Sequence, residues 1–451
     1  MQTLEKQAGT WKIGLLCLAV LAPFFFLSYG FANHYAAGLT SVKFIVFDWE
    51  NSIPLWPWTI VPYWSIDLFY GLSLLLCWNK FELKQHTLRL FSAQIISISC
   101  FLLFPLRFTF ERPELSGFFG IWFDVLMGFD KPFNQAPSLH IVLLVILWDF
   151  YRRHVRGAAK YLVDIWAFLI GFSVLTTWQH HFIDIPTGLL VGAICLWLFP
   201  LHTATPWARN TLNSFTLKHL KLGILYFIAA LFFVALSCEK GIWLWLLYPA
   251  FSMFLVSLTY LFNRPHFFQK QLNGKMTIAA WMLFAPYFLF AWINSRLWTY
   301  QQPEDSTIVT LGKTNVYLGR IPAKLTIQQY DALFDCCAEL PIQTDGQIYQ
   351  QSLSLDLIPL HANQLYQAVQ ALENIVQSDQ GTKAQNLLVF CALGYSRSSA
   401  VVAALLLKHY PEYSVEDCLR LIRHRRPWVV LKDAQIQQLN LYHLKLKGLA
   451  P

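Results

Sequence analysis

Uncharged apolar runs crowd the first 300 residues and stop near Trp298, and this break constrains the fold more than any other feature of the sequence. The runs are close to the length that a helix needs to cross a lipid bilayer. With 56% hydrophobic and only 13% charged residues, the chain is also too apolar for an ordinary soluble protein. We therefore expect a multi-pass α-helical membrane region followed by a separate globular region.

The candidate membrane spans are nine apolar runs, at residues 13–30, 60–78, 90–106, 138–151, 161–178, 185–201, 222–236, 242–262 and 276–294. Residues 117–127 form a further apolar segment, predicted as an interfacial helix or a partial span. Lys and Arg concentrate in those loops that would lie on the same side of the membrane as the N-terminus, which indicates a cytoplasmic N-terminus. Nine crossings then predict that the C-terminal region lies on the outer side of the membrane.

The net charge of +8 does not indicate a nucleic-acid partner, because Lys and Arg occupy short loops between apolar runs, where they act as topology signals. Nine cysteines are present, and none has the spacing of a zinc site. We expect no metal and no cofactor. The sequence leaves the oligomeric state open.

From residue 301 the composition becomes globular, with β-like runs at 316–318, 348–353 and 387–390, each followed by a helical pattern. About 150 residues are enough for one α/β domain. The predicted domains are a membrane module with six transmembrane helices at 1–202, three further transmembrane helices at 203–298, and an α/β domain at 299–451.

One loop in this α/β domain has a chemical signature. Residues 386–407 are predicted as a buried strand, a short loop and an apolar helix, and the loop has the pattern Cys391-x5-Arg397. Backbone N–H groups of such a loop, with the positive end of the following helix, can bind an anion and depress the pKa of the cysteine. Arg397 can hold two phosphate oxygens, Gly394 permits a tight loop, and Ser398 can donate a hydrogen bond to the sulfur.

This segment resembles the signature of the dual-specificity and protein-tyrosine phosphatases. Residues 316–322 resemble an early strand of that family, and residues 421–427 resemble the end of a late helix. The resemblance implies a cysteine phosphatase fold with Cys391 as nucleophile. The other implied residues are Arg397 as phosphate clamp, Ser398 as the residue that helps the sulfur to leave, and Gly394 and Ser396 as phosphate-binding loop residues.

A second segment, residues 355–359 followed by 363–365, resembles the general-acid loop of the same family, and it is most similar to the lipid-directed members that dephosphorylate phosphatidylglycerophosphate. The resemblance implies that Asp356 is the general acid, with nearby Asp345 as the competing candidate. The spacing from Asp356 to the cysteine is longer than usual, which a loop insertion in the polar stretch 377–385 would explain. Phe390 departs from the family, in which most members have a His at that position.

The membrane region contains three polar patches at the outer ends of predicted spans, at residues 107–113, 137–140 and 180–184. His180 and Asp184 are four residues apart, so on a helix the carboxylate can orient the imidazole and stabilise its charged form. A histidine oriented in this way can attack phosphorus, and a second histidine can protonate the leaving oxygen.

Across residues 60–200 these patches resemble the three-part signature of the type 2 phosphatidic acid phosphatases. The implied residues are His180 as nucleophile, Asp184 as its partner, His140 as general acid, and Ser138 and Arg112 as phosphate ligands. Arg107 would replace one missing cation. The departures are Pro105 in place of a Lys, Leu139 in place of a Gly and Val174 in place of an Arg. They favour the lipid phosphotransferase branch, which resembles the inositol-phosphorylceramide and sphingomyelin synthases.

The whole chain thus resembles a bacterial two-domain family that fuses the two kinds of module. The resemblance implies a multi-pass inner-membrane enzyme that removes phosphate from a phospholipid headgroup or related lipid phosphate. One alternative is a membrane-tethered protein-tyrosine or dual-specificity phosphatase with a vestigial membrane module. Another, of a different class, is a lipid transporter or scavenger with vestigial sites, against which the retained His140, His180 and Asp184 argue.

Overall fold

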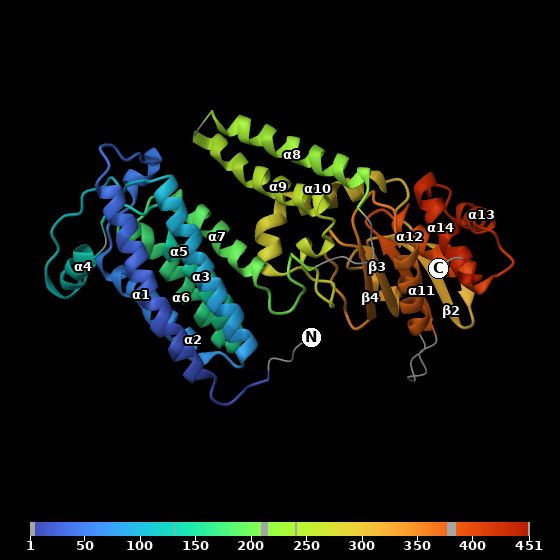
Figure 1. Ribbon diagram of the computed structural model, residues 1–451, viewed down its shortest axis with the longest axis horizontal. Coiled ribbons are helices and arrows are strands. Elements are labelled where there is room, and N and C mark those ends of the chain that lie inside the picture. Colours follow the sequence, from blue (N-terminus) through green and yellow to red (C-terminus); the bar gives the residue numbers. More distant parts are fainter. Residues whose placement is uncertain (1–4, 130, 209–214, 240, 377–384, 450–451) are drawn as a thin grey trace. The chain divides into compact units, whose positions relative to one another are not determined.

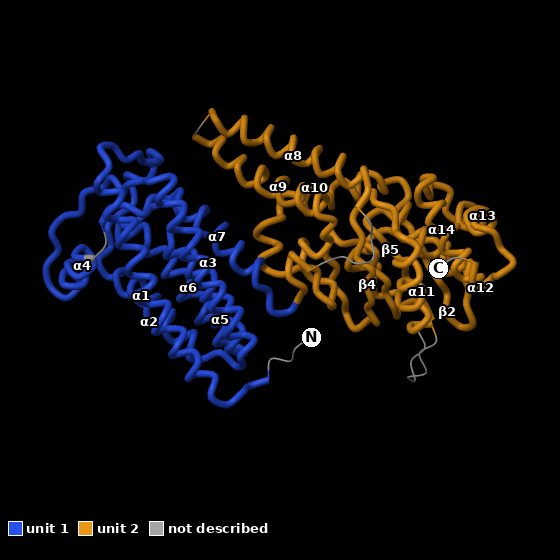
Figure 2. The backbone as a smooth tube through the Cα atoms, in the orientation of Figure 1, with its two compact units in different colours: residues 1–202 blue, residues 203–451 orange. Residues whose placement is uncertain are grey.

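The computed structural model describes residues 5–129, 131–208, 215–239, 241–376 and 385–449. Two compact units divide the chain, Met1–His202 and Thr203–Pro451 (Figure 2). Residues 203–298, which were predicted as a separate helical domain, therefore share one unit with the C-terminal α/β domain. The predicted loop insertion at 377–385 lies, except for its last residue, outside the described residues.

The first unit is entirely helical in its described part (Figure 1). Its α-helices are α1 (Thr10–Ala37), α2 (Ile60–Leu76), α3 (Lys80–Leu103), α4 (Gly117–Phe129), α5 (Leu139–His154), α6 (Ala159–Thr176) and α7 (Asp184–Leu198), with short 3-10 turns η1 (Asp48–Ser52) and η2 (Pro57–Thr59). Helix α5 is the innermost, because it packs against α2, α3, α6 and α7. Helix α3 begins earlier than the predicted span since its polar first half also packs inward, where Arg89 forms an ion pair with Asp149 at 2.9 Å.

The second unit begins with three helices that pack side by side. They are α8 (Leu217–Ser237), α9 (Leu247–Leu261) and α10 (Ile278–Trp298), with 3-10 turns η3 (Gly241–Leu246) and η4 (Pro265–Phe268). We call α8, α9 and α10 together the helical arm, and residues 262–277, between α9 and α10, the connector. Many apolar side chains of the arm are exposed.

Seven helical segments of the described chain are long and apolar enough to cross a membrane, by length and composition. They are Thr10–Ala37, Pro57–Leu76, Lys80–Leu103, Ala159–Thr176, Leu217–Ser237, Gly241–Leu261 and Ile278–Trp298. The other two of the nine predicted spans correspond to α5 and α7, which have only 16 and 15 residues. These two helices pack on each other through Gly188 and Gly192, where a Cβ atom would meet Ile141 and Val145 at 2.7 and 2.6 Å.

The α/β domain is built on a five-stranded mixed sheet (Figure 1). Its strands are β1 (Ser306–Leu311), β2 (Thr314–Arg320), β3 (Ala332–Cys337), β4 (Ile348–Ser354) and β5 (Asn386–Cys391), in the order β1-β2-β5-β3-β4. Only β1 is antiparallel to its neighbour. The three predicted β-runs are confirmed as parts of β2, β4 and β5, whereas β1 and β3 were not predicted.

The two faces of this sheet have different coverings. Helices α11 (Ala362–Val376), α12 (Arg397–His409), α13 (Val415–Arg425) and α14 (Asp433–Leu446) pack with one face in the larger core. Successive side chains of a strand point to opposite faces, so Val389 and Cys391 face this core while Leu388 and Phe390 face away from it. The opposite face carries a smaller core, against which Ala291 of α10 packs. The helical arm thus covers part of the sheet.

Candidate active site

The thiol of Cys391 lies at the C-terminal end of β5, where the chain turns into α12. Its Sγ accepts hydrogen bonds from the backbone N–H of Gly394 at 3.2 Å and from the hydroxyl of Ser398 at 3.3 Å. Helix α12 begins at Arg397, so the positive end of the helix dipole lies beside the sulfur. Only 2% of Cys391 is exposed. The predicted strand, loop and helix therefore form a cradle around one sulfur atom.

The cradle favours the thiolate form of Cys391. Burial raises the pKa of the thiol, but the positive charge of Arg397 and the hydrogen bonds from Ser398 and Gly394 outweigh burial, and the pKa falls below its ordinary value. Phe390, at the position where a supporting His was expected, is fully buried on the other face of the sheet. The thiolate is thus stabilised without that histidine.

The loop between the strand and the helix is tight and held from outside. Gly394 has φ +73°, and a Cβ atom there would lie 2.4 Å from the backbone of Gly319 on β2. The fully buried Arg426, at the end of α13, donates from Nε to the carbonyl of Gly394 at 3.1 Å. Ser396 is the N-cap residue of α12, and its hydroxyl accepts a hydrogen bond from Gln435. These contacts fix the loop before any ligand binds.

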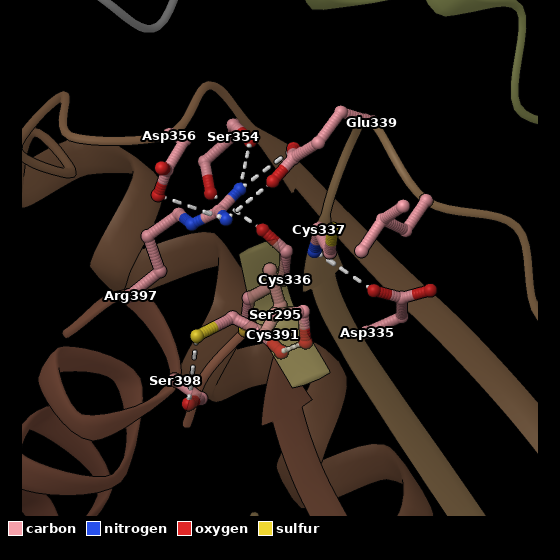
Figure 3. A network of polar contacts seen from close by, with 12 residues as sticks. Ser295, Asp335, Cys336, Cys337, Glu339, Ser354, Asp356, Cys391, Arg397 and Ser398 are labelled. Atoms are coloured by element: carbon pink, nitrogen blue, oxygen red, sulfur yellow. Dashed lines mark hydrogen bonds and ion pairs between the residues drawn. The ribbon is translucent and has the colours of Figure 1, made fainter. Parts of the chain in front are cut away.

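Arg397 is buried and makes a two-pronged ion pair with Glu339 (Figure 3). Its Nη1 and Nη2 lie 2.9 and 2.5 Å from the two carboxylate oxygens, and Nη1 also donates to the carbonyl of Ser354 at 2.9 Å. Burial opposes the charge, but Glu339 and Asp356 raise the pKa of Arg397 further, so the guanidinium stays charged. A planar guanidinium held in this way has a fixed orientation.

Asp356 follows β4 and brings a second carboxylate to the same arginine. Its Oδ1 lies 3.0 Å from Nη2 of Arg397 (Figure 3). Burial raises its pKa, and Glu339 adds to the rise, against the lowering effect of Arg397. A raised pKa keeps a carboxyl group protonated at higher pH, as a general acid requires. The competing Asp345 is exposed in the loop between β3 and β4, where its backbone N–H bonds to Gln347.

The helical arm contacts both loops of this site. The hydroxyl of Tyr260 on α9 donates to the backbone carbonyl of Asp356 at 3.3 Å. The hydroxyl of Ser295 on α10 donates to the carbonyl of Ala392, directly after the thiol, at 2.6 Å (Figure 3). The carbonyl of Trp298, the last residue of α10, accepts from the hydroxyl of Tyr395 at 2.9 Å. None of these contacts was predicted from the sequence.

Residues 315–445 match the family described as "Dual specificity phosphatase, catalytic domain". This part of the chain is a dual-specificity phosphatase domain. Such a domain hydrolyses phosphate monoesters, and the match contains Cys391, Arg397 and Asp356. It covers less than a third of the chain and includes none of the helical arm.

Solved structures similar to this phosphatase domain include three that illustrate its range. PTPMT1 in complex with PI(5)P is 20% identical and covers 30% of this chain and 92% of its own, with a TM-score of 0.26. Tk-PTP in its active form is 24% identical, with 32% and 97% covered and a TM-score of 0.27. Human DUSP28 is 19% identical, with 32% and 96% covered and a TM-score of 0.27. No curated protein matches the chain.

Outside the phosphatase domain, the first unit brings the two predicted catalytic histidines to one pocket. His140 and His180 line a cavity of about 320 Å³, together with aromatic side chains and Asp67. His180 Nδ1 lies 3.1 Å from Asp184 Oδ2, but the two residues do not share a helix as predicted, because α7 begins at Asp184 and His180 lies in the turn before it. The ring of Tyr63 stacks on His140 with 4.1 Å between the centroids. The neighbouring His181 pairs instead with Glu50 at 3.0 Å.

The other residues predicted for this pocket have different surroundings. Ser138 is fully buried and caps α5, where its Oγ accepts from the backbone N–H of Ile141 at 3.4 Å. The amide oxygen of Gln179 faces Arg112 and accepts hydrogen bonds from its Nη2 at 2.8 Å and its Nη1 at 3.1 Å. Arg107 is exposed, with its guanidinium 5.6 Å from the ring centroid of Phe44. The lining of the cavity includes none of the three predicted phosphate ligands Ser138, Arg112 and Arg107.

Glu339 is the main site residue that sequence reasoning missed. It lies in the irregular segment after β3, and no motif marks it in the sequence. Its role follows only from its position beside Arg397. Among the described residues, no group of three or more His, Cys, Asp or Glu side chains is arranged to hold a metal ion.

Proposed function

We propose that the chain is a membrane-bound phosphatase that removes phosphate from a phospholipid headgroup or a related lipid phosphate through a cysteinyl-phosphate intermediate. The observation that carries the proposal is the contact of span-length helices with both catalytic loops. Tyr260 on α9 bonds to the acid loop at Asp356, and Ser295 on α10 bonds to the phosphate loop at Ala392. A site held by two such helices lies close to the membrane surface, where a lipid headgroup is available.

The proposed reaction has two steps. The thiolate of Cys391 attacks phosphorus, so a P–S bond forms while the P–O bond to the lipid breaks, and Asp356 gives its proton to the leaving oxygen. Water then attacks the phosphocysteine with Asp356 as base, the P–S bond breaks, and inorganic phosphate leaves. Ser398 stabilises the departing sulfur through its hydrogen bond. Arg397 and the loop N–H groups hold the phosphate oxygens in both steps.

Groups close to the site support an anionic amphiphile as substrate. Lys218, at the start of α8, lies close enough to Asp356 to interact with it electrostatically. Leu357, directly after Asp356, is 49% exposed, and Val430, whose N–H bonds to the carbonyl of Tyr395, is 56% exposed. A cation and exposed apolar side chains near one cleavage site suit a phosphorylated headgroup attached to acyl chains.

The experiment compares substrates for the full-length protein in phospholipid vesicles. Phosphatidylglycerophosphate, a phosphoinositide and a phosphotyrosine peptide are offered at equal phosphate concentration, and released phosphate is measured. We expect the lipid substrates to have the higher kcat/KM and all activity to disappear in Cys391→Ser. A higher kcat/KM for the peptide would overturn the lipid proposal in favour of a tethered protein phosphatase.

For the first unit we propose a second, histidine-based phosphohydrolase or phosphotransferase site. The supporting observation is the shared cavity of His140 and His180, with Asp184 bonded to His180. Because Nδ1 of His180 faces Asp184, its Nε2 is the atom that would attack phosphorus, while His140 would protonate the leaving oxygen. The missing basic residues favour transfer to a second alcohol over hydrolysis.

We also propose that the protein resides in a bacterial inner membrane, with the phosphatase domain on the same side as the N-terminus and not, as nine predicted crossings would require, on the outer side. An even number of crossings precedes residue 203, whether the six predicted spans or the four span-length helices are counted. Lys218, at the start of α8, lies near Asp356, and segments at both ends of α10 contact the phosphatase domain through Lys270 and Ser295, so α8 and α9 cross as a pair while α10 stays on that domain. Reporter fusions after residue 451 and within residues 204–217 should report the same side. If they report opposite sides, α10 crosses the membrane and this placement is wrong.

A further inference from the structure

The connector between α9 and α10 places a lysine inside the phosphatase domain. The ammonium group of Lys270 is fully buried and uses its three N–H donors on three acceptors. They are Asp335 Oδ2 at 2.5 Å, the carbonyl of Cys337 at 2.8 Å and the carbonyl of Leu340 at 2.6 Å. Lys270 lies outside residues 315–445, so a segment outside the matched domain supplies this buried cation.

These acceptors surround the residue that holds the catalytic arginine. Cys337 and Leu340 flank Glu339, so Lys270 ties down the segment on both sides of it. Asp335 fixes the same segment from the strand, because its Oδ1 accepts from the backbone N–H of Cys337 at 2.8 Å. Glu339 in turn holds both Nη atoms of Arg397. Lys270 is therefore linked to the guanidinium of Arg397 through the backbone of the segment that carries Glu339.

A second contact fixes the connector next to this segment. The carbonyl of Gly274 accepts from the backbone N–H of Ile342, two residues after Leu340, at 2.9 Å. Gly274 has φ +79°, and a Cβ atom there would lie 2.3 Å from the side chain of Ile342. Only glycine permits this approach without displacement. The connector is thus held against the domain at Gly274 as well as at Lys270.

Burying an ammonium group is costly unless every donor is paired, and an apolar contact would join two elements at lower cost. Two of the three acceptors of Lys270 are carbonyls on either side of Glu339, and the third, Asp335, holds the same segment through the N–H of Cys337. We propose that Lys270 is a positioning residue for the phosphatase reaction, which sets Glu339 and through it the orientation of Arg397. The helical arm is then part of the catalytic unit, and not only its anchor. This inference rests on the proposed role of Arg397 in binding phosphate.

The test uses the full-length protein in detergent with p-nitrophenyl phosphate, which needs no lipid recognition. Lys270→Met alone would leave the buried Asp335 carboxylate without its countercharge, so the test variant combines Lys270→Met with Asp335→Asn. The single Asp335→Asn variant is measured beside it to separate the two residues. Lys275→Met is the matched control, because Lys275 is an exposed lysine of the same connector.

The readouts are the inhibition constant of inorganic phosphate, the acid limb of the kcat/KM profile and the thermal transition. We expect the double variant to weaken phosphate inhibition roughly 10- to 100-fold, because a misoriented binding group costs about that much. The acid limb should move to higher pH, because a displaced Arg397 depresses the pKa of Cys391 less. Lys275→Met should leave all three readouts unchanged.

A folded double variant with unchanged phosphate inhibition and an unchanged acid limb would overturn the inference and leave Lys270 a structural residue. If the double variant does not fold, phosphate inhibition is measured in Gly274→Ala instead. Its control is Gly312→Ala, because Gly312 also has a positive φ but open space around it. Weaker phosphate binding in Gly274→Ala alone supports the inference, and equal behaviour of the two overturns it. Cys391-dependent cleavage of the aryl phosphate without lipid cleavage would contradict the lipid proposal and leave this inference standing.

Discussion

The two candidate phosphate sites differ in how their groups are brought together. Around Cys391, one segment of eight residues supplies the sulfur, the N–H of Gly394, the guanidinium and the hydroxyl of Ser398. In the first unit, His140 and His180 come from segments forty residues apart in sequence, and the close packing of α5 on α7 brings them to one cavity. A local loop can be recognised from its spacing, whereas a site built by helix packing depends on the fold of the whole unit.

The sites also differ in the supply of positive charge. Arg397 is buried within reach of the loop and carries a raised pKa. In the first unit, Arg112 bonds to Gln179 and Arg107 stacks over Phe44, so neither lines the cavity. The difference is that the cavity of His140 and His180 has no arginine in its lining, whereas a buried arginine is built into the loop of Cys391.

The sharpest test of this comparison is Cys391→Ser. We expect turnover to fall roughly 10⁵-fold or more, because the nucleophile is lost. Binding of inorganic phosphate should remain, since Arg397 and the backbone donors are unchanged. Calorimetry measures binding, and phosphate release measures turnover. The control is Cys238→Ser, at an exposed cysteine of the same unit, and full turnover in Cys391→Ser would exclude the proposed intermediate.

The second prediction concerns His180→Ala in a Cys391→Ser background, where only the histidine site can act. Lipid phosphate cleavage or transfer should fall roughly 10⁴-fold, as for loss of a nucleophile. Adding Asp184→Asn should change little further, because the carboxylate acts only through the imidazole. His181→Ala is a comparison at a neighbouring histidine that bonds to Glu50. If the Cys391→Ser protein is active and stays equally active with His180→Ala, His180 is not the nucleophile. If the Cys391→Ser protein has no activity at all, the histidine site is vestigial.

The third prediction separates the two candidate acids of the phosphatase domain. Asp356→Asn should slow cleavage of an alkyl lipid phosphate roughly 10²- to 10⁴-fold but that of p-nitrophenyl phosphate far less, because only the poor leaving group needs a proton. The alkaline limb of the wild-type profile, set by the raised pKa of Asp356, should disappear with it. Asp345→Asn is the matched control. The opposite pattern, with selective loss in Asp345→Asn, would identify Asp345 as the acid.

The smallest expected effect is that of Ser398→Ala. Loss of its hydrogen bond to Sγ raises the pKa of Cys391, so less thiolate is present at low pH and the acid limb of kcat/KM moves to higher pH. A charge-assisted bond of this kind corresponds to roughly a 10- to 100-fold loss on that limb. Pre-steady-state kinetics should also reveal slower breakdown of the phosphocysteine. An unchanged acid limb would mean that Arg397 and the N–H of Gly394 lower the pKa of Cys391 without help from Ser398.

The predictable part of the structure was the part encoded locally. The strand, loop and helix around Cys391 follow from hydrophobic pattern and loop spacing, and β2, β4 and β5 were found for the same reason. Strand β3 was missed although it is fully buried, because Asp335 in its middle interrupts the apolar run. The countercharge of that aspartate is Lys270, from a segment 65 residues away. No local pattern contains such a partner.

The contacts of the helical arm were also beyond prediction from local sequence patterns. Its hydrophobicity predicted membrane spans, and that property is compatible with Tyr260 and Ser295 facing lipid or each other. Their hydrogen bonds to the catalytic loops depend on how the arm packs on the sheet, which hydrophobicity does not specify. The role of Glu339 was hidden for the same reason, since a carboxylate after a strand is ordinary until its guanidinium partner is located.

The position of Lys270 has a consequence for how the protein matures. Ribosomes deliver the chain from its N-terminus, so α9, the connector and α10 leave the ribosome before the strands of the phosphatase domain. If the arm inserts into the lipid first, the lysine is already in place as the sheet closes around it. A chain that failed to insert would lack a fixed connector, and the guanidinium of Arg397 would not be held in its orientation. Membrane integration would then act as a quality check, so that phosphatase activity arises only in molecules that have reached their site of action.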